Sequence, residues 1–145
     1  TAFRAAGVDE SRATLVGRQS LALYLETYRD IDVALDPYPY GGGTTSCDAL
    51  WVGVPLVSLA GRTPVSRAGS TLLSNIGLER LVATTEEQYV ERAAELIRDQ
   101  GRLAELRRQL RDRLESSPVM NAPQFARDFE AVLRSAWRAW CASRS

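Results

Sequence analysis

Three glycines followed by two threonines stand between two short apolar runs, and this arrangement restricts the fold more than any other part of the sequence. The stretch reads DPYPYGGGTTSCD at residues 36–48, with IDVAL before it at 31–35 and VPLVSL after it at 54–59. The apolar runs hardly alternate with polar residues, which is typical of parallel strands buried on both faces. Glycines after such a strand let the backbone come close to a ligand. A strand, a glycine turn and a helix start form a phosphate cradle in many nucleotide-binding α/β proteins.

The residues after the turn permit two interpretations. Thr44 and Thr45 are expected to begin a helix, where free backbone N–H groups and the helix dipole attract an anion. In the functional interpretation the backbone of Gly42 and Gly43 approaches a diphosphate and the threonine hydroxyls bind it. Asp48, about one turn further on the same face, then accepts hydrogen bonds from two ribose hydroxyls. In the structural interpretation Thr45 caps the helix and Asp48 reaches back, as in a capping box; both can hold together.

Strand and helix patterns alternate along the chain. Hydrophobic periodicity predicts strands at 13–16, 31–35, 56–59 and 80–83, and helices at 20–29, 45–52 and 65–76. Three further helices are expected: one begins at 84–87, one carries leucines at 103, 106, 110 and 114, and the last runs over 123–142. This order predicts an α/β fold, a Rossmann-like parallel sheet flanked by helices. A complete domain of this kind has more than four strands, so an incomplete one is expected.

The final helix carries an apolar stripe made of Phe125, Phe129, Val132, Leu133, Trp137 and Trp140. Such a stripe packs onto its own domain in most proteins. The two tryptophans offer an alternative, contact with a partner lobe, because exposed aromatic side chains mark interfaces.

Composition excludes several classes of function. The chain contains no histidine, which rules out a Ser-His-Asp triad, a Cys-His dyad and a histidine-based zinc site within it. Its 18 basic residues, all arginine, balance 18 acidic ones without a basic run, so no nucleic-acid partner is expected. Two distant cysteines, Cys47 and Cys141, fit a reducing compartment, taken here as the cytoplasm. No apolar run reaches the ~18–20 residues that a membrane span needs, so no membrane partner is expected.

The stretch 30–55, DIDVALDPYPYGGGTTSCDALWVGVP, resembles the end region of the O-linked N-acetylglucosamine transferases and their bacterial and SPINDLY-like relatives. The following VSLAGRTPVSRAGS at 57–70 resembles the same family, as do Tyr89, the leucine-rich helix and the closing Phe-rich helix. The likeness covers nearly the whole chain. Few families combine LDPYPY, a glycine–threonine turn and LAGRT in this order.

The resemblance implies part of a two-lobed GT-B glycosyltransferase, usually placed behind tetratricopeptide repeats. Residues 1–118 would be a nucleotide-sugar-binding lobe, incomplete at its N-terminus. Residues 119–145 would be a linker and an amphipathic helix packing back on that lobe. Such enzymes need no metal or cofactor and transfer a sugar, here expected to be N-acetylglucosamine from a UDP donor, to protein serine or threonine. The catalytic lobe that holds the acceptor would precede this chain, so the chain alone is expected to be inactive.

Site residues are carried over one by one. In the family the helix N-terminus and the threonine pair hold the donor diphosphate, and the acid one turn on holds the ribose. The matching positions here are Thr44, Thr45 and Asp48. The loop on the donor side adds three candidates, Arg62, Ser66 and Arg67. Nothing in the chain matches a general base.

Two positions depart from the family pattern. The animal enzymes have histidine just before the threonine pair, where this chain has Gly43, and many relatives have histidine where this chain has Tyr24. The lysine that usually holds the diphosphate would lie before residue 1. These departures leave open a second interpretation, a non-catalytic protein-interaction domain derived from the same fold. A third, another GT-B enzyme such as a lipid-linked sugar transferase or an epimerase, would need glutamate in place of Asp48.

The residues do not name the donor. The sugar stays open between N-acetylglucosamine, glucose and fucose, and the base between uracil and guanine. Backbone groups around residues 17–21 are expected to contribute to the base pocket.

Overall fold

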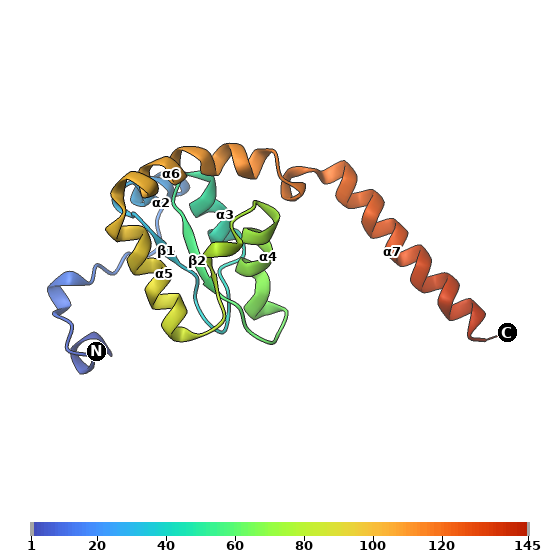
Figure 1. Ribbon diagram of the computed structural model, residues 1–145, viewed down its shortest axis with the longest axis horizontal. Helices are drawn as coiled ribbons and strands as arrows, with labels where there is room; N and C mark the ends of the chain where they lie inside the picture. Colours follow the sequence, from blue (N-terminus) through green and yellow to red (C-terminus); the bar gives the residue numbers. More distant parts are fainter. Residues whose placement is uncertain (1, 145) are drawn as a thin grey trace.

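The computed structural model of the protein describes residues 2–144 (Figure 1). Its helices are α1 (Ala2–Ala5), α2 (Leu21–Thr27), α3 (Thr44–Trp51), α4 (Ala68–Asn75), α5 (Glu86–Arg98), α6 (Gln100–Glu115) and α7 (Ala122–Ala142). Its strands are β1 (Ala34–Leu35), β2 (Leu56–Leu59) and β3 (Val82–Ala83). Short 3-10 turns, η1 (Glu10–Arg12), η2 (Tyr28–Asp30), η3 (Val65–Arg67), η4 (Glu79–Leu81) and η5 (Pro118–Met120), connect them.

The three strands form one parallel sheet in the order β1-β2-β3. Ala34 pairs with Leu56 on one side of β2, and Ser58 pairs with Val82 on the other. All four residues of β2 are buried, as expected for a strand covered on both faces. Helices α3, α4 and α5 contact β2 directly. The prediction of a parallel sheet flanked by helices is confirmed.

The core lies between the sheet and the helices around it. It consists of Leu50, Leu56, Val57, Leu72, Leu73, Ile76, Leu78, Leu81, Leu96, Leu106, Leu110 and Leu114. The leucine stripe predicted for α6 therefore faces inward, because residues three and four apart share one face of a helix.

Local signals also set helix ends. Thr85 accepts a hydrogen bond from the backbone N–H of Gln88 at the start of α5, as a capping threonine should.

One expected strand is absent. Residues 13–16 are predicted from the sequence to form a short buried strand, but in the structure they have no regular secondary structure and are mostly exposed. A strand is defined by its neighbour's hydrogen bonds, and the described sheet ends at β1. Of the two apolar runs that flank α2, 13–16 and 31–35, only the second contributes a strand, β1, to the sheet.

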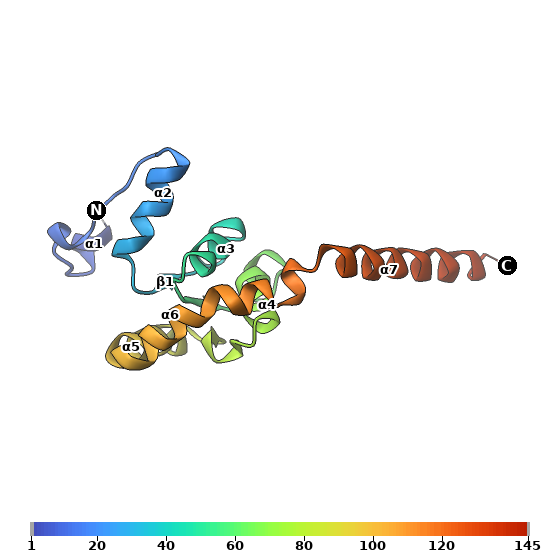
Figure 2. The ribbon, with the colours of Figure 1, turned by 90° about the horizontal axis from the view of Figure 1, so that it is seen from above.

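α7 leaves the body of the molecule and projects away from it (Figures 1 and 2). Every described residue from 121 to 144 is exposed, including the whole apolar stripe. The expectation that this helix packs back on the lobe is not met in the structure. The reason is that α6 already closes the core with its buried leucines, while α7 starts beyond η5 and continues outward.

Candidate functional site

The glycine turn is built around a buried carboxylate, that of Asp36, directly after β1. Its Oδ1 accepts hydrogen bonds from the backbone N–H of Gly42 at 2.8 Å and from the hydroxyl of Ser46 at 3.1 Å. Its Oδ2 accepts one from the hydroxyl of Ser58 at 2.7 Å. The side chain is 4% exposed. The N–H of Gly42 thus points into the protein, so of the two glycines singled out in the sequence only Gly43 can offer its amide to a ligand.

α3 begins immediately after the turn and presents open backbone donors. Gly43 is its N-cap, with φ 54°, a conformation that side-chain-bearing residues rarely adopt. Among the described residues, the N–H groups of Gly43 and Thr44 donate no hydrogen bond. Two free amides at the positive end of a helix dipole form an anion-binding arrangement. The exposed Thr44 lies at the same point.

The capping-box interpretation is wrong. The N-cap is Gly43, and the hydroxyl of Thr45 donates to the carbonyl oxygen of Gly42 at 2.8 Å instead of accepting from the helix. Asp48 does not reach back to the start of α3. The helix starts at Thr44, two residues earlier than a Thr45 cap requires, because glycine can take the positive φ that brings the chain into α3.

Asp48 instead accepts a hydrogen bond from Tyr24, which lies on α2 beside Tyr28. The hydroxyl of Tyr24 donates to Oδ2 of Asp48 at 3.1 Å, and it lies 2.7 Å from the hydroxyl of Tyr28. Tyr28 in turn donates to the carbonyl oxygen of Thr45 at 3.3 Å. Burial, followed by the hydrogen bonds to Tyr28 and Asp48, raises the pKa of Tyr24 above its ordinary range. Tyr24 therefore stays a neutral donor over the physiological pH range and holds one carboxylate oxygen of Asp48.

A pocket opens beside these tyrosines. It has a volume of about 630 Å³ and is lined by Thr14, Val16, Gly17, Arg18, Gln19, Tyr24, Thr27, Tyr28 and Ile31. Two aromatic rings at 5.3 Å between centroids, in an edge-to-face arrangement, form part of its wall. The pocket is thus lined both by the segment before α2 and by Tyr24, whose hydroxyl donates to Asp48. Its lining overlaps the segment 17–21 from which base contacts were expected.

The loop after β2 borders the glycine turn, because the N–H of Gly41 donates to the carbonyl oxygen of Val65 at 3.3 Å. Within this loop the three candidates differ. Ser66 is buried, and its hydroxyl donates to the carbonyl oxygen of Thr63 at 2.9 Å. Arg67 donates to the carbonyl oxygen of Gly61 at 3.2 Å. Arg62 is exposed, and within residues 2–144 it forms no hydrogen bond or ion pair.

The structure thus brings Gly43, Thr44 and Asp48 together on and around α3. Ser66 and Arg67 shape the neighbouring loop, and Arg62 is the arginine of that loop left free to meet a ligand. Sequence reasoning missed Asp36, Ser58 and Tyr28. An acid directly after a predicted strand was the signal for Asp36, because that edge of the sheet is where ligands bind.

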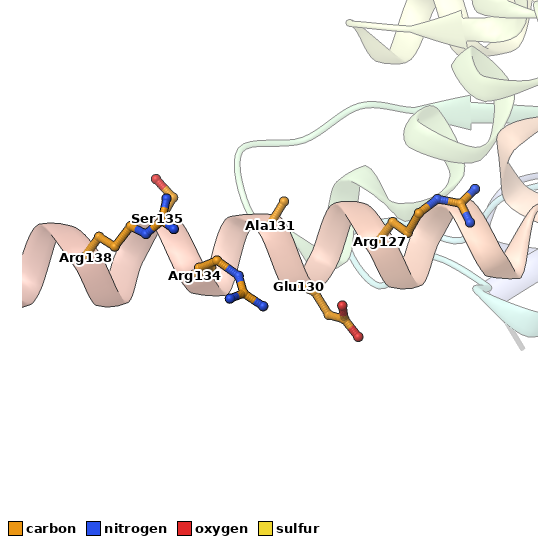
Figure 3. Close-up of a pocket in the computed structure, with 6 residues that line it drawn as sticks. All are labelled: Arg127, Glu130, Ala131, Arg134, Ser135 and Arg138. Atoms are coloured by element: carbon orange, nitrogen blue, oxygen red, sulfur yellow. The ribbon is translucent and has the colours of Figure 1, made fainter.

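A second hollow lies on α7, far from the glycine turn. It is lined by Arg127, Glu130, Ala131, Arg134, Ser135 and Arg138 (Figure 3). All of these come from one helix, and no other element within residues 2–144 lines the hollow. The hollow is the polar side of an exposed helix and lacks the convergent groups of a ligand site.

Across residues 2–144, no three histidine, cysteine or acidic side chains gather as a metal site would require. In the same part of the chain, no helix combines the length and apolar character needed to cross a bilayer.

Comparison with known proteins places this geometry in a family. Residues 12–129 match the model of glycosyl transferase family 41. The chain belongs to that family. It is 42% identical to a probable UDP-N-acetylglucosamine–peptide N-acetylglucosaminyltransferase SPINDLY of Hordeum vulgare over 118 residues, which cover 81% of this chain and 12% of that protein. It is 30% identical to the UDP-N-acetylglucosamine–peptide N-acetylglucosaminyltransferase of Caenorhabditis elegans over 132 residues, 91% of this chain and 12% of that protein.

A solved structure extends the likeness to the fold. A mutant of the Thermobaculum terrenum O-GlcNAc transferase superposes with a TM-score of 0.89 and 42% identity, covering 99% of this chain and 28% of that one. The family 41 chain described here is therefore part of a GT-B lobe, as the sequence predicted. It spans about an eighth of the length of the curated relatives it matches.

Proposed function

We propose that this chain is the donor-binding part of a metal-independent glycosyltransferase, one that moves a sugar from a nucleotide diphosphate to serine or threonine of a protein. N-acetylglucosamine, the sugar in the printed names of the relatives, and UDP are the proposed donor components. The observation that carries the proposal is the pair of open amides at Gly43 and Thr44, with Asp48 one turn along the same helix. The remaining catalytic lobe, the tetratricopeptide repeats and the acceptor protein are proposed partners in the whole enzyme.

The chemistry of transfer needs charge stabilisation on the leaving diphosphate. Donors that are fixed before the reaction supply such stabilisation without reorganising. Here the fixed donors are the two backbone amides. The hydroxyl of Thr44 and the exposed guanidinium of Arg62 add side-chain donors, and the guanidinium can bind a phosphate oxygen pair. Thr45 contributes by fixing the turn through its bond to Gly42.

The nucleoside is proposed to lie in the pocket beside Tyr24 and Tyr28. This pocket of about 630 Å³ is adjacent to Asp48 through the bond from Tyr24. Oδ2 of Asp48 accepts from Tyr24, which leaves Oδ1 and the outer lone pairs for ribose hydroxyls. The aromatic walls and the backbone of residues 14–19 then meet the base, as is usual for mostly apolar ligand pockets with a few polar groups.

Calorimetric titration of the chain with UDP and GDP, in EDTA, tests the proposal. We expect one nucleotide to bind, and Asp48→Ala to weaken it by about 1–3 kcal/mol through loss of a charged hydrogen-bonding partner. Asp112→Ala is the matched control, because Asp112 is an exposed acid on α6 that belongs neither to the glycine turn nor to the lining of the pocket beside Tyr24. A well-folded chain that binds neither nucleotide, or equal losses in both variants, would contradict the proposal.

A second candidate function, a non-catalytic protein-interaction domain, is favoured by α7. Its stripe exposes Phe125, Phe129, Val132, Leu133, Trp137 and Trp140 by 46–67%. The rings of Phe125 and Phe129 stack on each other, as do those of Trp137 and Trp140, which gives the stripe two flat aromatic surfaces. In a transferase this stripe is proposed to meet the part of the enzyme outside the chain. Nucleotide binding separates the two functions, since only the donor-binding function requires it.

A further inference from the structure

Asp36 is a buried charge with no charged partner. None of the ion pairs among residues 2–144 includes it, and its two oxygens are held by one backbone amide and two serine hydroxyls. Burying a carboxylate is costly unless hydrogen bonds compensate for the lost water. Hydrogen bonds to a charged acceptor are stronger than those to a neutral one, so three of them can hold it.

Several segments of the lobe converge on this one side chain. Gly42 belongs to the turn, Ser46 to α3 and Ser58 to β2. The backbone carbonyl of Asp36 accepts a further bond from the hydroxyl of Tyr89 on α5, at 2.8 Å. Gly69 brings α4 so close that an added Cβ would collide with Oδ2 of Asp36. The carboxylate therefore connects the strand end, the turn and the helices that surround the candidate site.

We infer that Asp36 is the positioning residue of the donor-diphosphate cradle. Its Oδ1 accepts a hydrogen bond from the Gly42 amide, which therefore points into the protein. The chain then turns at Gly43, so that the amides of Gly43 and Thr44 face outward. This inference rests on the proposed function of the turn as a diphosphate site. Asp36 touches no ligand in this role, because its side chain is 4% exposed and both oxygens accept hydrogen bonds from the protein.

The geometry of the bonds separates this role from general stabilisation. Oδ1 binds the turn through Gly42, whereas Oδ2 binds only Ser58 of the sheet. We call the bond to Gly42 the turn side and the bond to Ser58 the sheet side. The substitution Asp36→Asn can keep a hydrogen bond on both sides, because the carbonyl of a side-chain amide can accept from Gly42 and its NH₂ group can donate to the Ser58 hydroxyl. The substitution Asp36→Ala removes both sides. Ser58→Ala removes the sheet side and leaves the turn side intact.

The first experiment compares binding of UDP and uridine, or GDP and guanosine if the chain prefers guanine, with thermal unfolding measured alongside. In Asp36→Ala we expect UDP affinity to fall at least tenfold and uridine affinity to change less than threefold. Asp36→Asn should restore UDP binding to within threefold. Ser58→Ala should lower Tm while leaving the ratio of UDP to uridine affinity unchanged. Parallel losses of UDP and uridine affinity that follow Tm across all three variants would overturn the inference.

The second experiment needs no variant and covers the case in which Asp36→Ala does not fold. Amide hydrogen exchange is measured by NMR on the unaltered chain. We expect the Gly42 amide to exchange at least tenfold more slowly than those of Gly43 and Thr44, and UDP to slow only the latter two. Equal exchange at all three amides, or protection of Gly42 by UDP, would overturn the inference. If neither UDP nor GDP binds, the proposed function fails, while the unliganded exchange rates still show whether Asp36 orients the turn.

Discussion

The hydroxyl of Tyr24 donates to the carboxylate of Asp48 at 3.1 Å across 24 residues of sequence. Tyr24 lies on α2, a helix without a buried residue, and Asp48 lies on α3, which packs on the sheet and on α6. The bond therefore helps to attach a peripheral helix to the lobe and orients the acid proposed to hold a ribose. Stability and ligand binding are both expected to depend on it.

Replacing Tyr24 by phenylalanine removes this bond and the contact with the Tyr28 hydroxyl. We expect the free energy of unfolding to fall by about 0.5–1.5 kcal/mol, the usual net contribution of one hydrogen bond. UDP affinity should fall several-fold, because Asp48 loses its orienting donor. Urea unfolding and calorimetry measure the two effects. Tyr40→Phe is the control, since Tyr40 is 74% exposed, and a loss as large in Tyr40→Phe would contradict the assignment.

Stability is expected to decline in alkaline solution. Burial raises the pKa of Tyr24 and of Tyr89, so the folded state favours their neutral forms. A raised pKa contributes stability that is fully present below the unfolded-state value of about 10 and is lost as pH rises through the folded-state value. Urea unfolding between pH 8 and pH 11 should show the free energy of unfolding falling above about pH 10. Tyr24→Phe should make that fall shallower, and an unchanged slope would contradict this account.

Gly69 and Gly101 form a matched pair of helical glycines. A Cβ at Gly69 would clash with Asp36 and lie 2.5 Å from the hydroxyl of Ser58, so Gly69→Ala should destabilise the chain by about 1–3 kcal/mol. At Gly101 the nearest atom would be 3.7 Å away. Gly101→Ala should therefore stabilise the chain by about 0.4–1 kcal/mol through lower entropy of the unfolded state. Urea unfolding of the two variants should give opposite signs, and a loss at both positions would refute the packing argument.

Two leucines test the separation of α7 from the core. Leu110 of α6 is fully buried, and Leu110→Ala should cost about 2–5 kcal/mol of unfolding free energy. Leu133 of α7 is 55% exposed, and Leu133→Ala should change it by less than about 0.5 kcal/mol. Chemical denaturation at low protein concentration measures both. A cost at Leu133 close to that at Leu110 would show that α7 packs on the lobe in solution.

Local patterns in the sequence determined much of the lobe. The bounds of β2, the start of α3 to within one residue, the Thr85 cap and the leucine stripe of α6 follow from short-range rules of periodicity and capping. These features depend on residues close to each other in the sequence, so the amino-acid sequence is enough to predict them.

Tertiary structure decided where those elements meet and which polar groups stay open. Asp36 binds Ser58 across 22 residues, and Tyr24 binds Asp48 across 24, contacts that no local pattern specifies. The loss of the strand at 13–16 and the exposure of α7 have the same cause, because strand pairing and helix burial both require a surface supplied by distant residues. The sequence by itself indicated the residues proposed for the cradle. Packing determined that the Gly42 amide donates to Asp36, while the amides of Gly43 and Thr44 donate to no group among the described residues.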